Sequence, residues 1–210
     1  RPRDRATRRG KGTRALLPSS SPCHTHATHD PTHPQRRLLI IGLANSGKTT
    51  LVNALRDDTS ANDANNDADV APTVGFAIER FVALKTELVV VDMSGQRKYA
   101  DTLWECYYED ADAVVFVVDA AESDAAVEEA RVALTEALVR APKAGKKEGK
   151  LTKKRPPLAV FANKSDVPAA RTASELASAM RLTGESDALA GRAWHVGACC
   201  ARTGEGVREG

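Results

Sequence analysis

Short apolar runs alternate with amphipathic stretches along most of this chain. Leu38–Ile41 and Val114–Val118 are unbroken apolar runs, the pattern of strands that are buried on both faces of a parallel sheet. Two further strand-like runs, 76–84 and 87–92, are separated by Lys85-Thr86, which suits a tight hairpin. The other expected strands are 157–161 and 193–197.

Segments with helical character lie between these strands. Residues 48–56 and 173–182 have helical composition. Within 122–140, one face repeats the apolar residues Val127, Ala130, Leu134 and Leu138. Strands that alternate with helices predict an α/β domain with a mostly parallel six-stranded sheet and helices on both faces. The hairpin contributes the one antiparallel strand.

Other segments depart from this pattern. Residues 1–37 are rich in Arg, Pro, Ser, Thr and His without apolar periodicity, so we expect a disordered segment there and a globular domain over 38–210. Residues 57–71 and 141–157 are expected to be solvated polar loops. The last residues read as the opening of a helix, so we expect the C-terminal helix of the domain to be truncated.

Charge is distributed unevenly along the chain. Residues 1–37 carry eight Arg and one Lys against two Asp, whereas the net charge of the whole chain is only +2. The body is therefore mildly acidic, which does not favour binding of nucleic acid. The basic, His-rich head is either a contact for acidic lipids or mis-joined sequence.

No apolar run approaches the roughly 20 residues of a membrane span. The four cysteines match no zinc or disulfide framework, so we expect reduced thiols in the cytoplasm.

The first candidate site is the loop between the strand 38–41 and the helix 48–56. Its residues fit the pattern G-x-x-x-x-G-K-[ST], in which glycines let backbone N–H groups wrap around phosphates. The helix that follows adds its positive N-terminal end. Lys48 can reach the β- and γ-phosphates, and the Thr49 hydroxyl can ligate Mg²⁺. The candidate phosphate-binding residues are Gly42, Asn45, Ser46, Gly47, Lys48, Thr49 and Thr50.

The sequence Asn163-Lys164-Ser165-Asp166 follows a strand and indicates a guanine site. Guanine presents N1–H and N2–H₂ side by side, and the carboxylate of Asp166 can accept from both. Asn163 can brace the phosphate loop or contact the base, and the stem of Lys164 can lie over the base plane. Taken alone, the motif could equally be a strand-terminating turn. After the last strand, the backbone N–H of Ala198 is a candidate to approach the guanine carbonyl oxygen, and Cys199 is a further candidate nucleotide-binding residue.

Two further segments carry residues suited to sensing a γ-phosphate. Asp92 can hold Mg²⁺, the N–H of Gly95 can bond the γ-phosphate, and Gln96 can orient the attacking water. The bland alternative for this segment is an ordinary Ser-Gly turn. Thr73, between Pro72 and Gly75, can supply further oxygen ligands to Mg²⁺. The candidate metal ligands are therefore Thr49, Thr73 and Asp92.

In this order and spacing, the motifs resemble those of the Ras-like superfamily of small G domains, and their details resemble its Arf branch. Residues 72–76 are similar to the first switch of Arf and Arf-like proteins. Residues 92–96, with 103–108, are similar to the second switch. Residues 194–196 and 204–210 resemble the Arf-like members that are linked to Bardet–Biedl syndrome and cilia.

The resemblance implies a small GTPase switch that binds GTP or GDP with Mg²⁺ and hydrolyses GTP slowly. It implies a GTPase-activating protein (GAP) and an exchange factor. It also implies peripheral membrane contact and recruitment of a coat-like effector, the BBSome, in membrane protein trafficking at the cilium or basal body. Gln96 would be the catalytic residue.

One residue and one missing element depart from the Arf pattern. Ala44 stands where the branch usually has an acidic residue, which leaves the hydrolysis rate open. The final helix is also missing. The alternatives are therefore a nucleotide-bound interaction module with negligible GTP hydrolysis, or a truncated product without function.

Overall fold

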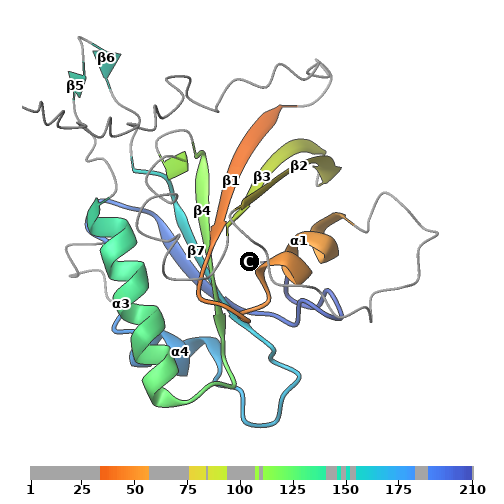
Figure 1. Cartoon of the computed structure of the whole chain (residues 1–210), viewed down its shortest axis with the longest axis vertical. Helices are drawn as coiled ribbons and strands as arrows, with labels where there is room; N and C mark the ends of the chain where they lie inside the picture. Colours follow the sequence, from red (N-terminus) through yellow and green to blue (C-terminus); the bar gives the residue numbers. More distant parts are fainter. Residues whose placement is uncertain are drawn as a thin grey trace, which may run out of the picture.

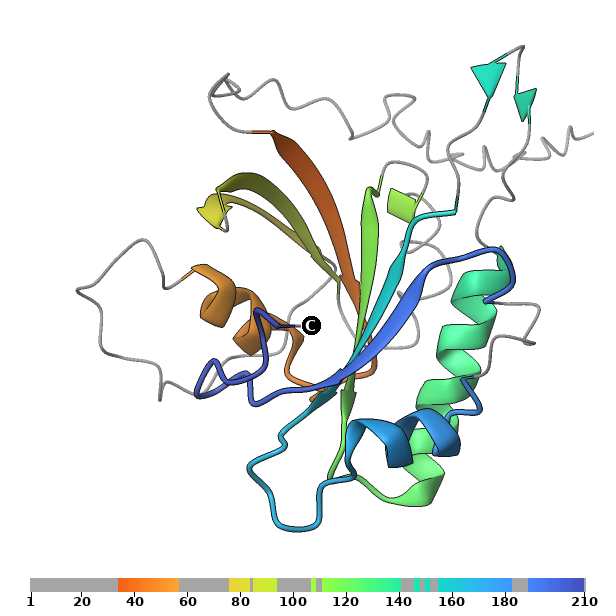
Figure 2. The same cartoon turned by 180° about the vertical axis from the view of Figure 1, so that it is seen from behind.

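The computed structural model places six strands in one sheet (Figure 1). It describes residues 34–56, 76–83, 85–93, 107–108, 111–140, 146–147, 150–151, 155–182 and 189–209. Within these ranges the strand order is β2-β3-β1-β4-β7-β8, and β8 forms one edge (Figure 2). The strands are β1 (Gln35–Ile41), β2 (Phe76–Ala83), β3 (Thr86–Met93), β4 (Ala113–Asp119), β7 (Leu158–Asn163) and β8 (Trp194–Ala198).

The sheet is parallel except for one strand pair, as the sequence predicts. β1 pairs in parallel with β3 and β4, and β7 pairs in parallel with β4 and β8. Only β2 runs antiparallel, beside β3, in a register that extends from Phe76↔Met93 to Ala83↔Thr86. Lys85, inside the hairpin connection, has a φ of 57°, the positive value that tight hairpin turns favour.

Buried apolar residues supply both faces of the inner strands. In β4, Val114, Phe116 and Val118 pack into one core, whereas Val115 and Val117 pack into the other. This alternation follows from the pleat, which points successive side chains to opposite faces. An unbroken apolar run is therefore required wherever both faces are covered.

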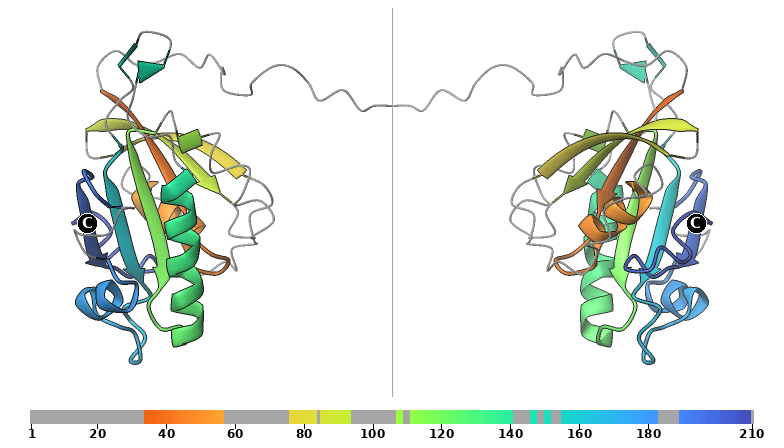
Figure 3. Two further views of the ribbon diagram at one scale, coloured as in Figure 1. Left: turned by 90° about the vertical axis from the view of Figure 1, so that its left-hand side faces the viewer. Right: turned by 90° about the vertical axis from the view of Figure 1, so that its right-hand side faces the viewer.

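Helices cover both faces, as expected. α1 (Lys48–Arg56) packs Leu51 and Val52 against one face. α3 (Asp124–Arg140) and α4 (Ala173–Ala179) cover the other (Figure 3). The predicted apolar face of α3 is buried, and its members are Val127, Ala130, Leu134 and Leu138. Among the described residues, no helix is both long and apolar enough to span a membrane.

Several boundaries differ from the sequence-based expectation. β1 begins at Gln35, three residues before the apolar run, because backbone pairing with β3 recruits polar residues: Gln35 lies opposite Glu87, and the N–H of Glu87 donates to Pro34 O at 3.1 Å. α4 ends at Ala179 rather than at residue 182. Within the expected loop 141–157, β5 (Lys146–Lys147) and β6 (Lys150–Leu151) form a small antiparallel pair.

Two neighbouring residues of α3, one buried and one exposed, should differ in how much truncation of the side chain changes stability. Leu138→Ala should lower the free energy of unfolding by about 2–5 kcal/mol, because the Leu138 side chain is buried in the core. Val139→Ala, at the neighbouring position but 61% exposed, should change it by less than about 0.5 kcal/mol. Urea unfolding followed by circular dichroism measures both values. Equal losses in the two variants would contradict the placement of α3.

Candidate nucleotide-binding site

The loop from β1 to α1 passes so close to other backbone and side-chain atoms that two of its positions require glycine. Gly42 has a φ of 147°, and a Cβ there would lie 2.3 Å from Val117 O. Gly47 has a φ of 92°, and a Cβ there would lie 2.2 Å from Asn163 Nδ2. Both positions exclude a side chain by space as well as by conformation. The glycines of the predicted phosphate loop therefore have a structural explanation.

Lys48, the first residue of α1, lies inside this loop. Lys48 is 6% exposed, and its ammonium donates to Leu43 O at 2.7 Å, a carbonyl of the same loop. Burial lowers the pKa of Lys48 to about 8, while the nearby Asp92 carboxylate acts in the opposite direction. A buried cation that donates to a neutral carbonyl favours the approach of an anion.

Thr49 and Asp92, predicted to share a metal ion, are in contact although they lie on different elements. The Thr49 hydroxyl donates to Asp92 Oδ2 at 2.6 Å. Asp92 is buried near the end of β3, opposite Ile40 of β1, and so lies beside the start of α1. A hydroxyl and a carboxylate oxygen at this separation are hard oxygen donors, which Mg²⁺ prefers. The residues present therefore fit a magnesium ion.

The side chain of Asn163 joins the phosphate loop to the segment after β8. Its Nδ2 donates to Ser46 O at 2.8 Å, and its Oδ1 accepts from Ala201 N at 2.9 Å. The thiol of Cys199 also points to Oδ1, at 3.6 Å. Asn163 is 2% exposed and its amide is engaged at both ends. Of the two roles considered for this residue, bracing the loop is the one that the geometry supports.

The Asp166 carboxylate lies beside the same segment and is engaged at both oxygens. Cys200 Sγ donates to Oδ1 at 3.1 Å, and Arg202 Nη2 donates to Oδ2 at 2.9 Å. The hydrogen bond from Cys200 is the main cause that lowers the pKa of Asp166, and Arg202 contributes to the same shift. The carboxylate therefore stays ionised, the state that accepts hydrogen bonds from two neighbouring N–H groups.

The two residues predicted to contact the base after β8 have different places in the sheet. Cys199 N–H donates to Ala162 O at 2.9 Å. Ala198 is the register partner of Ala162 at the end of β8, which runs one residue further than expected, and its contact with the base stays a prediction. The amide of Cys199 is thus used within the sheet. The residues beside Asp166 are instead Cys200 and Arg202, which sequence reasoning missed. The one feature of the sequence that could have indicated Cys200 and Arg202 is their position just before the Thr203-Gly204 turn.

Two of the four cysteines lie in this segment, and Cys23 and Cys106 lie outside the described residues. Cys199 and Cys200 are both free and buried. Burial raises the pKa of the Cys199 thiol to about 12, so it stays protonated near neutral pH.

The remaining candidates divide into described and undescribed positions. Asn45 is exposed with a φ of 61°, and Thr50 is half-buried on α1. Lys164 has a φ of 66°, and its ammonium lies 2.5 Å from Asp119 Oδ2. The predicted switch residues Thr73, Gly95 and Gln96 lie outside the described residues.

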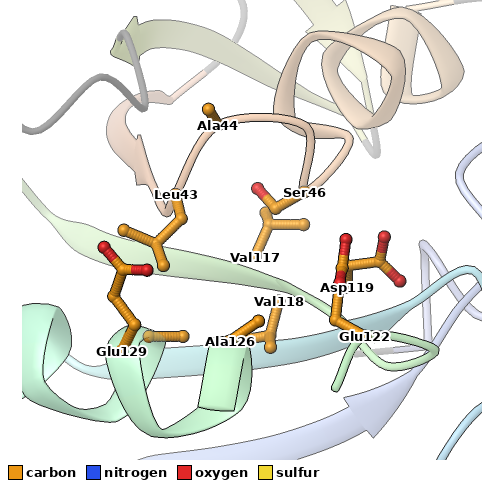
Figure 4. Close-up of a pocket in the computed structure, with 10 residues that line it drawn as sticks. Leu43, Ala44, Ser46, Val117, Val118, Asp119, Glu122, Ala126 and Glu129 are labelled. Atoms are coloured by element: carbon orange, nitrogen blue, oxygen red, sulfur yellow. The ribbon is translucent and has the colours of Figure 1, made fainter. Parts of the chain in front are cut away.

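A cavity of about 300 Å³ lies on the α3 side of the phosphate loop (Figure 4). Leu43, Val117 and Ala130 contribute apolar surface, and Glu122 and Glu129 contribute carboxylates. The lining also includes Ser46, one of the predicted phosphate-binding residues, and Asp119 at the end of β4. Lys48, Thr49 and Asp166 do not line the cavity.

Comparison with known proteins shows the family of this chain. The chain matches the model of the ADP-ribosylation factor family over residues 26–210. It is 35% identical to ADP-ribosylation factor-like protein 3 of Chlamydomonas reinhardtii over 176 residues, which are 84% of this chain and 86% of that protein. It is also 35% identical to ADP-ribosylation factor-like protein 6 of Danio rerio, covering 82% of this chain and 83% of that protein. The chain therefore belongs to the ADP-ribosylation factor family of small GTPases, and the resemblance inferred from its motifs is confirmed.

Solved structures agree with the fold. The Arl6 BBS3 small GTPase of Trypanosoma brucei, with bound nucleotide analogue GppNp, superposes with a TM-score of 0.65 and 30% identity, covering 83% of this chain and 92% of that chain. A chain of the mammalian SRP receptor gives the same TM-score of 0.65 at 18% identity, covering 83% of this chain and 95% of that chain, which shows a shared fold only. The predicted small G domain is confirmed.

The contact between Gly47 and Asn163 predicts a large effect of one methyl group. Gly47→Ala should weaken GDP binding by roughly 100-fold, because a Cβ would collide with an amide held at both ends and strain of about 1–3 kcal/mol arises at positive φ. Titration with a fluorescent GDP analogue measures the loss.

Gly191→Ala is the matched control for this substitution. Gly191 has a φ of 69° but no atom within 4 Å of the added Cβ, so it introduces strain without a collision. Its GDP affinity should equal that of the wild-type protein. If both variants lose affinity alike, the proximity of Asn163 is not what excludes a side chain at Gly47.

Proposed function

We propose that this GTPase acts as a switch at the site just described, binding GTP or GDP together with Mg²⁺. The observation that carries this proposal is the 2.6 Å contact between Thr49 Oγ1 and Asp92 Oδ2, which joins the phosphate loop to the strand that leads into the second switch. A ligand that bridges these two elements connects nucleotide state to the conformation of the switch. The family supports the guanine nucleotide, and Mg²⁺ is our inference from the donor set.

In this proposal each candidate residue has one role. The backbone N–H groups of the loop and the ammonium of Lys48 hold the phosphates, in place of the present contact with Leu43 O. Thr49, Thr73 and Asp92 hold the metal ion, which when bound neutralises phosphate charge. The Gly95 N–H senses the γ-phosphate, and Gln96 orients the attacking water.

Asp166 supplies base specificity in this proposal. Its two oxygens at present accept from Cys200 and Arg202. Guanine N1–H and N2–H₂ would take the place of the exposed Arg202 contact, because an ion pair at the surface is worth only about 0–1 kcal/mol. Adenine offers no such pair of donors, and the site would reject it.

We further propose a role in membrane protein trafficking at the cilium. Support comes from the relatives named ADP-ribosylation factor-like protein 6 and Arl6 BBS3. In the GTP-bound form the protein would contact the cytoplasmic membrane surface peripherally and recruit a coat-like effector, with the BBSome as the candidate. A GAP and an exchange factor would control the cycle.

Base specificity gives the first test of this proposal. Asp166→Asn should weaken GDP binding by roughly 100-fold, because the amide nitrogen cannot accept a hydrogen bond and faces the donors of guanine. Xanthine carries a carbonyl oxygen where guanine carries N2–H₂, so the same variant should bind xanthosine diphosphate better than GDP. Competition against a fluorescent GDP analogue measures both affinities.

A conservative change elsewhere separates this effect from a general loss of charge. Glu136→Gln removes one exposed carboxylate on α3, and it should leave the GDP affinity unchanged. Preference of the wild-type protein for ADP over GDP would reject the guanine assignment outright.

Gln96→Leu provides the test of hydrolysis and effector recruitment. It should lower GAP-stimulated single-turnover hydrolysis by about 10³-fold or more and increase retention of the coat-like effector on GTP-loaded protein, because the leucine cannot orient water. The only other glutamine of the sequence, Gln35 on β1, supplies the control Gln35→Leu. If the GAP accelerates GTP hydrolysis in neither the wild-type protein nor the two variants, and all three hydrolyse GTP at the same rate, the interaction module is favoured over the switch.

A further inference from the structure

The ammonium of Lys164 is held by a residue that no motif includes. Lys164 Nζ lies 2.5 Å from Oδ2 of Asp119, the last residue of β4. Asp119 is opposite Asn163 in the sheet, so the two residues reach the same end of neighbouring strands. Oδ1 of Asp119 accepts from Ala121 N at 3.0 Å, which fixes the carboxylate from its own side.

The backbone that follows Asp119 is held in turn by Arg171. The N–H of Arg171 donates to Ala120 O at 2.9 Å. Its guanidinium donates to Ala120 O at 3.2 Å, to Glu122 O at 2.5 Å and to Asp124 Oδ1 at 2.6 Å. These contacts join the connection between β4 and α3 to the segment ahead of α4. The segment ahead of α4 therefore fixes the backbone that follows Asp119, while the Asp119 carboxylate itself contacts Lys164, after β7.

Lys164 and Asp166 have partners on opposite sides of β7. Lys164 contacts β4 through Asp119, whereas Asp166 contacts the segment after β8 through Cys200 and Arg202. The positive φ of Lys164 turns the chain at this point, and the two side chains diverge from there. A flat base whose edge is bound by Asp166 would then have the aliphatic stem of Lys164 along its face.

We propose that Asp119 is a positioning residue for the guanine base, acting through Lys164, and that Arg171 holds the loop that carries it. This inference rests on the proposed nucleotide site. A free lysine side chain samples many rotamers, and an ion pair at its end restricts the stem to the geometry that covers the base. The Lys164 side chain is 38% exposed, so water screens its end of the pair, whereas the Asp119 side chain is 11% exposed. The comparison of two ligands isolates the effect of the pair on binding from its effect on folding.

The test compares a ligand that has a base with one that has none. Asp119→Asn should weaken binding of GDP by about fivefold and leave binding of inorganic tripolyphosphate unchanged, because only the base contacts the Lys164 stem. Both ligands are titrated in competition with a fluorescent GDP analogue on the full chain. Glu122→Gln, which removes an exposed carboxylate three residues away, should change neither affinity.

A double-mutant cycle identifies the route of the effect. Lys164→Met keeps an aliphatic stem without the charge, and in that background Asp119→Asn should have no further effect on GDP binding. Arg171→Gln, which leaves the charge of Asp119 intact, should reproduce the selective loss for GDP. This second variant keeps the test decisive where Asp119→Asn fails to fold.

Two results would overturn the proposal. Equal losses for GDP and tripolyphosphate would assign Asp119 and Arg171 to general structure, and an unchanged GDP affinity in both variants would remove their role altogether. Failure of the wild-type protein to bind GDP is a separate outcome, because it rejects the nucleotide site itself rather than the positioning of the base.

Discussion

The buried amide side chain of Asn163 connects loops that are distant in the sequence, and the geometry of the candidate site depends on it. Its nitrogen donates to Ser46 O in the phosphate loop, while its oxygen accepts from Ala201 N in the segment after β8. Gly47 lies so close to this amide that no side chain fits there. A shorter or apolar residue at position 163 would leave buried backbone groups without partners, which costs more than the hydrogen bonds themselves contribute.

The parallel sheet makes this arrangement possible. Because the carboxyl ends of parallel strands meet at one edge, residues far apart in the chain arrive side by side there. Asp92 lies opposite Ile40, just before the phosphate loop, and Asp119 lies opposite Asn163. β3, β4 and β7 thus place Asp92, Asp119 and Asn163 at or near their ends, and the register decides which of these polar residues become neighbours. The same strand register therefore determines both which apolar side chains pack in the core and which polar side chains meet at the candidate site.

Sequence reasoning recovered what depends on local pattern. The bounds of α1, the hairpin and the buried face of α3 follow from periodicity and turn composition. It failed where a contact depends on register between distant strands. Cys199 was a candidate for nucleotide binding, and the use of its amide in the β7–β8 pairing cannot be read from the sequence. Likewise, nothing in the residues around Asp119 indicates that the carboxylate meets Lys164, 45 positions later.

The charges of the site also couple its two expected ligands. Burial lowers the pKa of Lys48 to about 8, so the ammonium is only partly compensated by the carbonyl that it contacts. A phosphate beside it would restore a normal pKa, and that gain contributes to affinity. Yet Asp92 brings a buried negative charge to the same place, and it would repel a phosphate. A divalent cation held by Thr49 and Asp92 would offset this repulsion. Nucleotide and Mg²⁺ should therefore bind together, each strengthening the other.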